Sequence, residues 1–485
     1  MKGFWHSNRW ILLFSLLAAI YHFATLSFSP IPWFDETFFA SISRSVKEGK
    51  GLILEAAPFY TGDKPVLIYG PIYFYLQAGV IWLLGLSEWS FRLLNLLAAA
   101  GIVIAVNQML KDKVQQPIRA SIVLLLAFDT IFLQNAHSGR MDLLALLFLF
   151  IAYFPIFKNK TTIAGILRSS VFLLAAILTT PRIIVFSLPL ALWLLYLLIK
   201  ENKVISVLVF GIVLLLGYYL WVAIGFGSIK NFFFYYLDSS VRKGSKNLIE
   251  GFVGGNFNIR PYQIPLILIT LITLFMRIRK WTWLTIICTT NILSFYLLVK
   301  DTGIYSSLII SFWLMLLAEN ISIIKVHFFK TWMALIAVIG IINLGIFLIK
   351  STIIFASWEQ RSPSNIENWI NANIPKGSKV VGDYKYYYAT IKNGSDFQFI
   401  GLGGTPEERL AYHLDIYKAD FILTSSDTDR QVLQTYTNGI RKYEKIRIDP
   451  VPAPGTVYSI IGKVLEKLSI KFSEGYEGQM YKVIR

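Results

Sequence analysis

Acidic residues at two places in a largely apolar chain are candidates for catalysis. Asp35 and Glu36 follow the first apolar stretch, and Asp142 begins a later one. Carboxylates at a bilayer boundary are costly to maintain and are usually functional. A carboxylate beside a hydroxyl can act as the general base that removes its proton. A simpler interpretation is that Asp35 is an N-cap that starts a helix running to Val46.

A short connection between two apolar stretches combines basic and acidic residues. His137 and Arg140 lie just before Asp142. An arginine, a histidine and an aspartate at the start of a membrane span are costly unless they pair or bind something, so this connection is a stronger functional signal than the first acids. The simpler interpretations are an Arg140–Asp142 ion pair that seals the loop and a solvated His137.

Two further segments carry cations that suit a phosphate. Asp63 and Lys64 precede an aromatic-rich stretch that contains Tyr69 and Tyr73, and Arg242 lies in a long glycine-rich loop. A lysine at headgroup level can bind a lipid phosphate while aromatic side chains line a sugar or acyl chain. A mobile loop with a cation can close over an anionic headgroup. Taken alone, each segment is explained more simply by a surface turn, an aromatic belt or an exposed loop.

The composition places these residues in a membrane protein. Of the 485 residues, 55% are hydrophobic and only 15% are charged. The net charge of +17 comes from short basic segments between apolar stretches. This is the pattern of loops that set membrane topology, so we expect no nucleic-acid partner. The single cysteine, Cys288, excludes a disulfide framework within the chain and a thiolate metal site.

About eleven apolar stretches are long enough to cross a hydrocarbon layer of roughly 30 Å, allowing for tilt. They begin near Trp10, Trp89, Ala120, Leu143, Ile163, Ile183, Val204, Ile264, Trp281, Ile304 and Trp332. A further run from Ile72 to Leu86 is assigned to a juxtamembrane helix on the outer surface, because counting it as a span would place the later basic loops outside.

This topology puts the N-terminus in the cytoplasm and the two acidic segments on one side of the plasma (inner) membrane. Residues 29–88, 134–142 and everything after about Ser351 share the outer side. Asp35 and Asp142 are therefore predicted to face the same compartment.

The composition changes after the last apolar stretch. Short β-rich runs at 379–381, 421–423 and 458–460 alternate with helical patterns, which predicts an α/β domain. We therefore expect a mainly α-helical, polytopic protein with two domains. Residues 1–351 form the transmembrane catalytic domain, with outer juxtamembrane helices in its first loop, and residues 352–485 form an extracytoplasmic α/β domain.

The ordered set of motifs resembles the GT-C superfamily of integral membrane glycosyltransferases, in the branch of lipid A aminoarabinose transferases and protein O-mannosyltransferases. The matching segments are Asp35-Glu36, Asp63-Lys64-Pro65, Ser87-Glu88 with Arg92, Arg140-Met141-Asp142, and Arg242. Val66 departs from the second proline of the family. Thr180-Pro181-Arg182 stands where a Lys-Gly is common, so Arg182 would supply the missing cation.

The resemblance implies an inverting transfer of a sugar from a polyprenyl-phosphate donor to an acceptor hydroxyl or phosphate on a lipid, glycan or protein. Asp35 would be the base, with Glu36 and Asp142 orienting it or a cation. The phosphate would be bound by Lys64, Arg242 and Arg140, and the rest of the substrate by Asp63, Tyr69, Tyr73, His137 and Arg182.

No cofactor is required by this scheme, and a divalent metal is left open. Asp35, Asp142 and His137 could supply ligands, but their spacing alone does not establish a site. The alternative function is a multi-span transporter or lipid flippase with an outer binding domain. Transporters usually carry charge or broken helices near mid-membrane, whereas the acids of this chain collect at one boundary.

Overall fold

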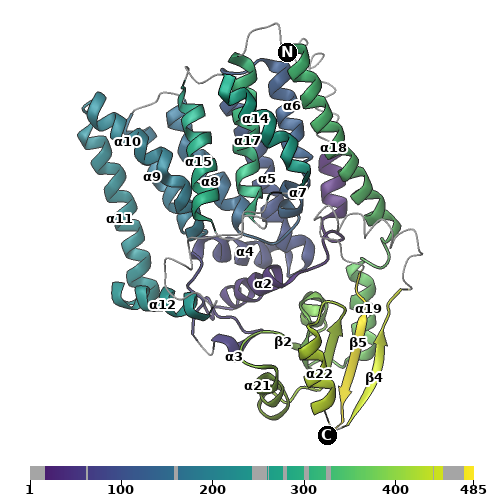
Figure 1. The fold of residues 1–485 in the computed structure, drawn as a ribbon. Helices are drawn as coiled ribbons and strands as arrows, with labels where there is room; N and C mark the ends of the chain where they lie inside the picture. Colours follow the sequence, from purple (N-terminus) through teal and green to yellow (C-terminus); the bar gives the residue numbers. More distant parts are fainter. Residues whose placement is uncertain are drawn as a thin grey trace.

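The structure is a computed structural model in which a helical bundle stands on a smaller α/β unit (Figure 1). It describes residues 17–61, 64–157, 162–242, 259, 261–276, 281–299, 305–323, 329–440, 442–451 and 475–484. The N-terminal helix is described over residues 17–25. The predicted stretch that begins near Trp10 therefore lies partly outside the described residues.

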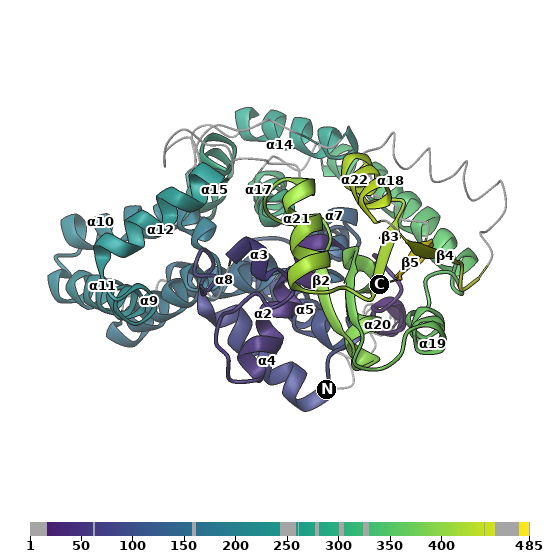
Figure 2. The same ribbon diagram turned by 90° about the horizontal axis from the view of Figure 1, so that it is seen from below.

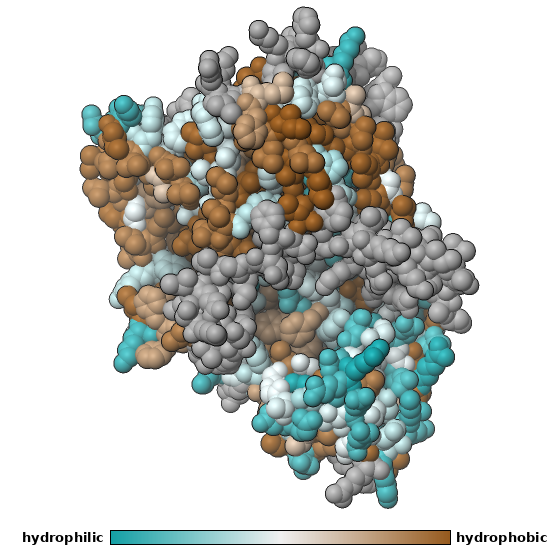
Figure 3. All heavy atoms as spheres, viewed as in Figure 1, coloured by the Kyte–Doolittle hydropathy of each residue, from teal (hydrophilic) through white to brown (hydrophobic). Residues whose placement is uncertain are grey.

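The bundle consists of apolar helices that lie roughly side by side. They are α5 (Glu88–Leu110), α6 (Gln116–Ala127), α7 (Thr130–Ala136), α8 (Asp142–Phe157), α9 (Ile163–Ile177), η1 (Pro181–Ser187), α10 (Leu188–Lys200), α11 (Val204–Phe226), α14 (Ile264–Met276), α15 (Trp283–Leu298), α17 (Ser307–Ile323) and α18 (Phe329–Ala356). Figure 3 shows apolar side chains over the bundle and hydrophilic ones over the α/β unit.

Several of these helices are suited to lipid. In the described part of the chain, four are long and apolar enough to cross a membrane, and a fifth span results if α6 and α7 are counted together. Large apolar side chains point outward, as Leu215 and Ile224 do on α11 with 75% and 80% exposure. The chain is an integral membrane protein. The predicted count of eleven stays a prediction, because the other apolar helices of the bundle are only 10–17 residues long.

The break between α6 and α7 has a local cause. Asp129 accepts hydrogen bonds from the backbone N–H groups of Ile131 (3.1 Å) and Phe132 (2.9 Å). An aspartate in this position caps a new helix, and the two helix axes differ by 56°. The second helix, α7, leads directly into the connection that carries His137 and Arg140.

The first loop contributes α2 (Phe34–Lys47), α3 (Pro58–Thr61) and α4 (Pro71–Leu84). Both α2 and α4 lie across the lower end of the bundle (Figure 1). The ring of Phe39 contacts Tyr73 and Phe74 of α4, with centroids 6.2 Å and 5.9 Å apart. The predicted helix at Ile72–Leu86 is thus α4, and its orientation agrees with a juxtamembrane position.

A close backbone contact fixes the start of α4. The backbone N–H of Ile72 donates to the carbonyl oxygen of Leu178 at 3.1 Å. A Cβ atom on Gly70 would lie 1.8 Å from the same oxygen, so this position requires glycine. The contact brings Tyr69 next to the chain segment that leads into Arg182.

The C-terminal segment forms a five-stranded mixed sheet in the order β2-β1-β3-β5-β4. Its strands are β1 (Lys379–Gly382), β2 (Asp396–Phe399), β3 (Phe421–Ser425), β4 (Tyr443–Ile448) and β5 (Gly478–Val483). Strand β1 is parallel to β2 and β3, and β5 is antiparallel to β3 and β4. The predicted strands at 379–381 and 421–423 are confirmed, whereas 458–460 lies outside the described residues.

Short helices pack beside the sheet, and some of them lie next to the first loop. They are α19 (Pro363–Asn373), η4 (Tyr384–Tyr386), α20 (Tyr387–Lys392), α21 (Pro406–Ala411), η5 (Tyr412–Ile416) and α22 (Arg430–Gly439). Figures 1 and 2 both place α21 beside α3, where the rings of Phe59 and Tyr412 have centroids 5.3 Å apart.

The sheet and the first loop share one hydrophobic core. Buried side chains of α2, residues 52–57, α20 and β2 belong to a single cluster. The rings of Phe34 and Phe399 have centroids 5.8 Å apart, and the backbone N–H of Phe399 donates to Ala56 at 2.7 Å. The division into domains 1–351 and 352–485 stays a prediction, and the described contacts join the two parts closely.

Candidate active site

Two predicted site segments meet at the lower end of the bundle. The guanidinium of Arg140 forms an ion pair with Asp35, which lies in the first turn of α2. Its Nε donates to Oδ2 of Asp142 at 2.6 Å. The prediction that Asp35 and Asp142 lie on the same side is confirmed by this shared partner. The N-cap of α2 is Trp33, so the alternative of Asp35 as an N-cap is wrong.

Asp35, Arg140 and Asp142 differ in how far their side chains are exposed to solvent. The side chains of Arg140 and Asp142 are only 4% and 2% exposed, whereas Asp35 is 33% exposed. In this cluster, Asp35 is therefore the group that an outside molecule can reach. Arg140 pairs with both carboxylates and thereby holds Asp35 in place. Its predicted role in binding the donor phosphate stays a prediction.

Aromatic rings surround the Arg140 guanidinium. Its central carbon lies 5.1 Å from the ring centroids of both Trp33 and Tyr305. A second cation, Arg182, also lies over the Tyr305 ring, with its guanidinium carbon 4.4 Å from the ring centroid. Cation–π contacts of this kind stabilise a desolvated cation without neutralising its charge. Sequence reasoning gave no role to Trp33 or Tyr305, because they lie 107 and 165 positions from Arg140 on the chain and no local pattern links them.

Arg182 and Lys64 are two further cations that the sequence predicted for the site. Among the described residues, neither forms an ion pair with a carboxylate, and Lys64 is exposed. Tyr69 lies near Arg182 and Asp35. Burial raises the pKa of Tyr69, and the charge of Asp35 acts in the same direction while Arg182 opposes it. Tyr69 is therefore a neutral hydroxyl that can donate a hydrogen bond.

Helix α12 (Ile229–Arg242) lies against the segment that contains Lys64. The backbone N–H of Leu67 donates to the Tyr235 hydroxyl at 2.8 Å, and the Tyr236 hydroxyl donates to the carbonyl of Ile68 at 3.1 Å. Arg242 is the last residue of this helix. Its side chain and the whole of Asp63 lie outside the described residues, so their predicted roles stay predictions.

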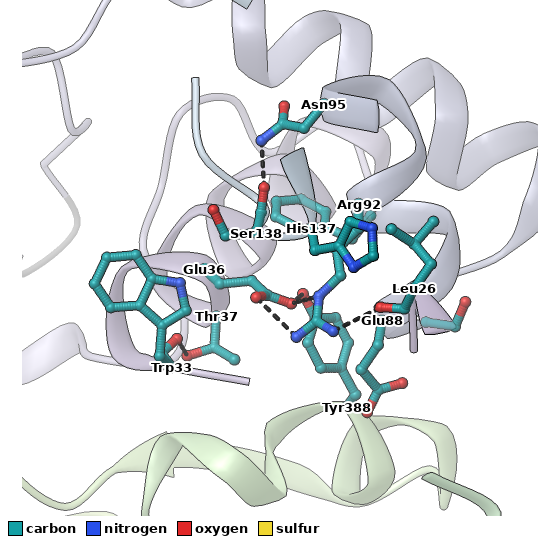
Figure 4. A network of polar contacts seen from close by, with 12 residues as sticks. Leu26, Trp33, Glu36, Thr37, Glu88, Arg92, Asn95, His137, Ser138 and Tyr388 are labelled. Atoms are coloured by element: carbon teal, nitrogen blue, oxygen red, sulfur yellow. Dashed lines mark hydrogen bonds and ion pairs between the residues drawn. The ribbon is translucent and has the colours of Figure 1, made fainter. Parts of the chain in front are cut away.

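Glu36, which the sequence predicted to orient Asp35 or a cation, pairs with a different arginine from Asp35. Glu36 pairs with Arg92 of α5, with N–O distances of 2.8 Å and 3.0 Å, and both side chains are fully buried (Figure 4). Arg92 also donates to the carbonyl of Leu26 at 2.7 Å. Glu36 therefore anchors α2 to the bundle and is not in the Asp35 cluster. Sequence reasoning quoted Arg92 as part of a motif but missed this pairing.

The connection that carries Arg140 is fixed by α5. The carboxamide of Asn95 donates hydrogen bonds to the carbonyl oxygens of Ser138 and Arg140. A Cβ atom on Gly139 would lie 2.2 Å from the ring of Phe91. The backbone can approach α5 this closely only with glycine at 139, so the position of Arg140 depends on the loop's sequence as well as on its ion pairs.

His137 does not join the acidic cluster, and its predicted role in binding substrate stays a prediction. Its Nδ1 lies 3.1 Å from the carbonyl oxygen of Ser29, and its Nε2 lies 2.8 Å from Nδ1 of His22. A carbonyl only accepts, so His137 donates from Nδ1 and accepts at Nε2. Burial holds the pKa of His137 well below its usual value, which keeps the ring neutral. Within the described ranges, no three His, Cys, Asp or Glu side chains form a group suited to a metal ion.

Tyr73, a further predicted substrate-binding residue, is buried between α4 and its neighbours. Its hydroxyl accepts a hydrogen bond from Nε2 of Gln77 at 3.0 Å, and its exposure is 0%. The geometry makes Tyr73 part of the packing behind the site. Of the predicted substrate-binding residues that the structure describes, Tyr69 and Arg182 are the ones that lie near Asp35 and Arg140.

Comparison with known proteins identifies the fold. No family model and no curated protein sequence matches this chain. The solved structure of ArnT from Cupriavidus metallidurans in the apo state superposes with a TM-score of 0.57 and 14% identity, covering 87% of this chain and 94% of that chain. The same protein bound to undecaprenyl phosphate gives a TM-score of 0.57 and 12% identity, with 98% of each chain covered.

An oligosaccharyltransferase from Archaeoglobus fulgidus, tethered to an acceptor peptide, is a more distant match. Its TM-score is 0.51 at 10% identity, covering 86% of this chain and 69% of that chain. At such low identities the likeness establishes the fold alone. The chemistry has to be inferred from the residues of the site. The chain has the fold of the GT-C glycosyltransferases.

Proposed function

We propose that this protein is a membrane glycosyltransferase that moves a sugar from a polyprenyl-phosphate donor to an acceptor hydroxyl or phosphate. The observation that carries the proposal is the Asp35–Arg140–Asp142 cluster, in which one accessible carboxylate is held by a buried arginine. A solved structure of the same fold is bound to undecaprenyl phosphate. The acids lie together at one end of the bundle, which favours surface chemistry over transport.

The proposed reaction combines the positions of these charges with the inverting transfer that the family resemblance implies. Asp35 removes the proton from the acceptor hydroxyl as its oxygen bonds to the anomeric carbon of the donor sugar. The bond from that carbon to the phosphate oxygen breaks, and polyprenyl phosphate leaves on the opposite face, so the anomeric configuration inverts. Arg182 and Lys64 stabilise the charge on the leaving phosphate. Arg140 keeps Asp35 oriented, and Tyr69 donates to an oxygen of the donor.

Removing either of the cations Lys64 and Arg182 is expected to weaken use of the donor. We expect Lys64→Ala and Arg182→Ala each to lower kcat/KM for the donor by about 10- to 100-fold, the usual loss for one charged hydrogen bond. The assay follows transfer from a radiolabelled polyprenyl-phosphate sugar by the purified protein. Lys376→Ala, which removes an exposed cation from the α/β unit, is the control. Wild-type kinetics in both variants would show that Lys64 and Arg182 do not bind the donor phosphate.

The site is proposed to lie on the outer face of the plasma membrane, together with the C-terminal unit. Lys376→Cys in that unit should react with an impermeant thiol reagent in intact cells. The native thiol, Cys288, is buried, so background labelling of the parent protein is expected to be low. Labelling of Lys376→Cys that appears only after lysis would reverse the proposed topology.

A further inference from the structure

Tyr388 of the C-terminal unit contacts the Glu36–Arg92 ion pair, next to the candidate base Asp35. The hydroxyl of Tyr388, on α20, donates to Oε1 of Glu36 at 3.3 Å, across 352 residues of sequence. Figure 4 shows this ring pointing from α20 toward the Glu36–Arg92 pair. Tyr388 is 2% exposed and Glu36 is fully buried. A hydrogen bond to a buried carboxylate is costly to lose, because no water replaces it.

A second tyrosine makes the same kind of contact nearby. The hydroxyl of Tyr476 donates to Oε1 of Glu88 at 3.3 Å. Glu88 is the first residue of α5, one helical turn before Arg92. Both glutamates and both tyrosines are buried. The C-terminal unit therefore contacts two buried carboxylates, Glu36 of α2 and Glu88 of α5, near the end of α5 that holds the site.

Glu36 connects Tyr388 to the cluster in two ways. It is the residue after Asp35 on the first turn of α2, so a shift of Glu36 moves the backbone that carries Asp35. It also accepts a hydrogen bond from the backbone of Gly139, the residue before Arg140. Asp35 is thus linked to Glu36 through the backbone of α2, and Arg140 is linked to it through the hydrogen bond from Gly139. Tyr388 donates to the same Glu36 carboxylate.

We propose that Tyr388 is a positioning residue through which the C-terminal unit sets the geometry of Asp35 and Arg140. This inference rests on the proposed transferase function for its catalytic consequence. Tyr388 touches neither substrate nor Asp35, and acts through Glu36. Losing its hydroxyl leaves Asp35 present but less well aligned, which lowers the rate of the chemical step and spares donor binding.

The test compares Tyr388→Phe with Tyr386→Phe. Tyr386 is an equally buried tyrosine of the same unit, but its hydroxyl donates to the carbonyl of Glu477 at 2.8 Å, within the unit itself. We expect Tyr388→Phe to lower kcat by about 3- to 10-fold with an unchanged KM for a polyprenyl-phosphate sugar. We expect Tyr386→Phe to keep the wild-type kcat. Equal values of kcat in the two variants would overturn the proposal.

A measurement without substrate separates this inference from the proposed function. Hydrogen–deuterium exchange of the full-length protein reports on α2 and on residues 137–141. We expect faster exchange in both segments for Tyr388→Phe than for Tyr386→Phe. Equal exchange rates would overturn the positioning role even if the wild-type protein transfers sugar. Faster exchange in a protein that transfers no sugar would uphold the mechanical link and reject the transferase assignment.

Discussion

Replacing Asp35 by asparagine is expected to lower kcat for sugar transfer by about 10²- to 10⁴-fold, the usual contribution of a general base. Asparagine keeps the size of the side chain and can still accept a hydrogen bond from Arg140, which also retains Asp142. Donor binding is therefore expected to persist. The measurement is kcat with a radiolabelled donor, together with the KM of that donor.

Glu48→Gln is the matched control for this prediction. Glu48 is the C-cap of the same helix, and its carboxylate pairs at the surface with Arg44 and Lys50. Its loss removes one negative charge from α2 without touching the cluster. Normal transfer in Asp35→Asn would exclude Asp35 as the base, while a large loss in both variants would indicate a general effect of charge on α2.

Replacing Arg92 by methionine is expected to destabilise the protein by about 3–5 kcal/mol, because it leaves the buried carboxylate of Glu36 without its cation. Burial already raises the pKa of Glu36, an effect that Arg92 opposes. The change is measured as a fall in the midpoint of thermal unfolding in detergent. Arg44→Met is the control, since its pair with Glu48 is 29% and 28% exposed and is worth about 0–1 kcal/mol.

A second substitution tests the cause of this loss. Glu36→Gln combined with Arg92→Met removes the uncompensated charge but keeps an oxygen for Tyr388 and Gly139. The double variant should therefore recover part of the lost stability. If Arg92→Met unfolds at the same temperature as Arg44→Met, the buried pair does not anchor α2 as described.

Much of the cluster could be predicted from the sequence because it depends on where apolar stretches begin and end. Basic loops set the direction of each span, and this was enough to place Asp35 and Asp142 on one side. Runs of β-branched and aromatic residues predicted strands β1 and β3. The helix at Ile72–Leu86 was identified by its apolar length, and its position across the bundle by the charges of later loops.

The direction of each side chain could not be predicted in the same way. Asp35 and Glu36 are neighbours, but successive residues of a helix point about 100° apart. Only packing decides that Asp35 faces Arg140 while Glu36 faces Arg92, which is 56 residues away. For the same reason His137 was assigned to the site, although the loop turns its ring toward His22.

The core shared by the sheet and the first loop limits how this chain can be recombined with its structural relatives. A chimera that exchanged only residues 352–485 would place foreign side chains against Phe34 and remove the backbone partner of Ala56. The graft that preserves these contacts is discontinuous and includes residues 33–61 as well. The part of the chain that carries Asp35 and the α/β unit thus form one structural module, although Asp35 and residue 352 are 317 positions apart in the sequence.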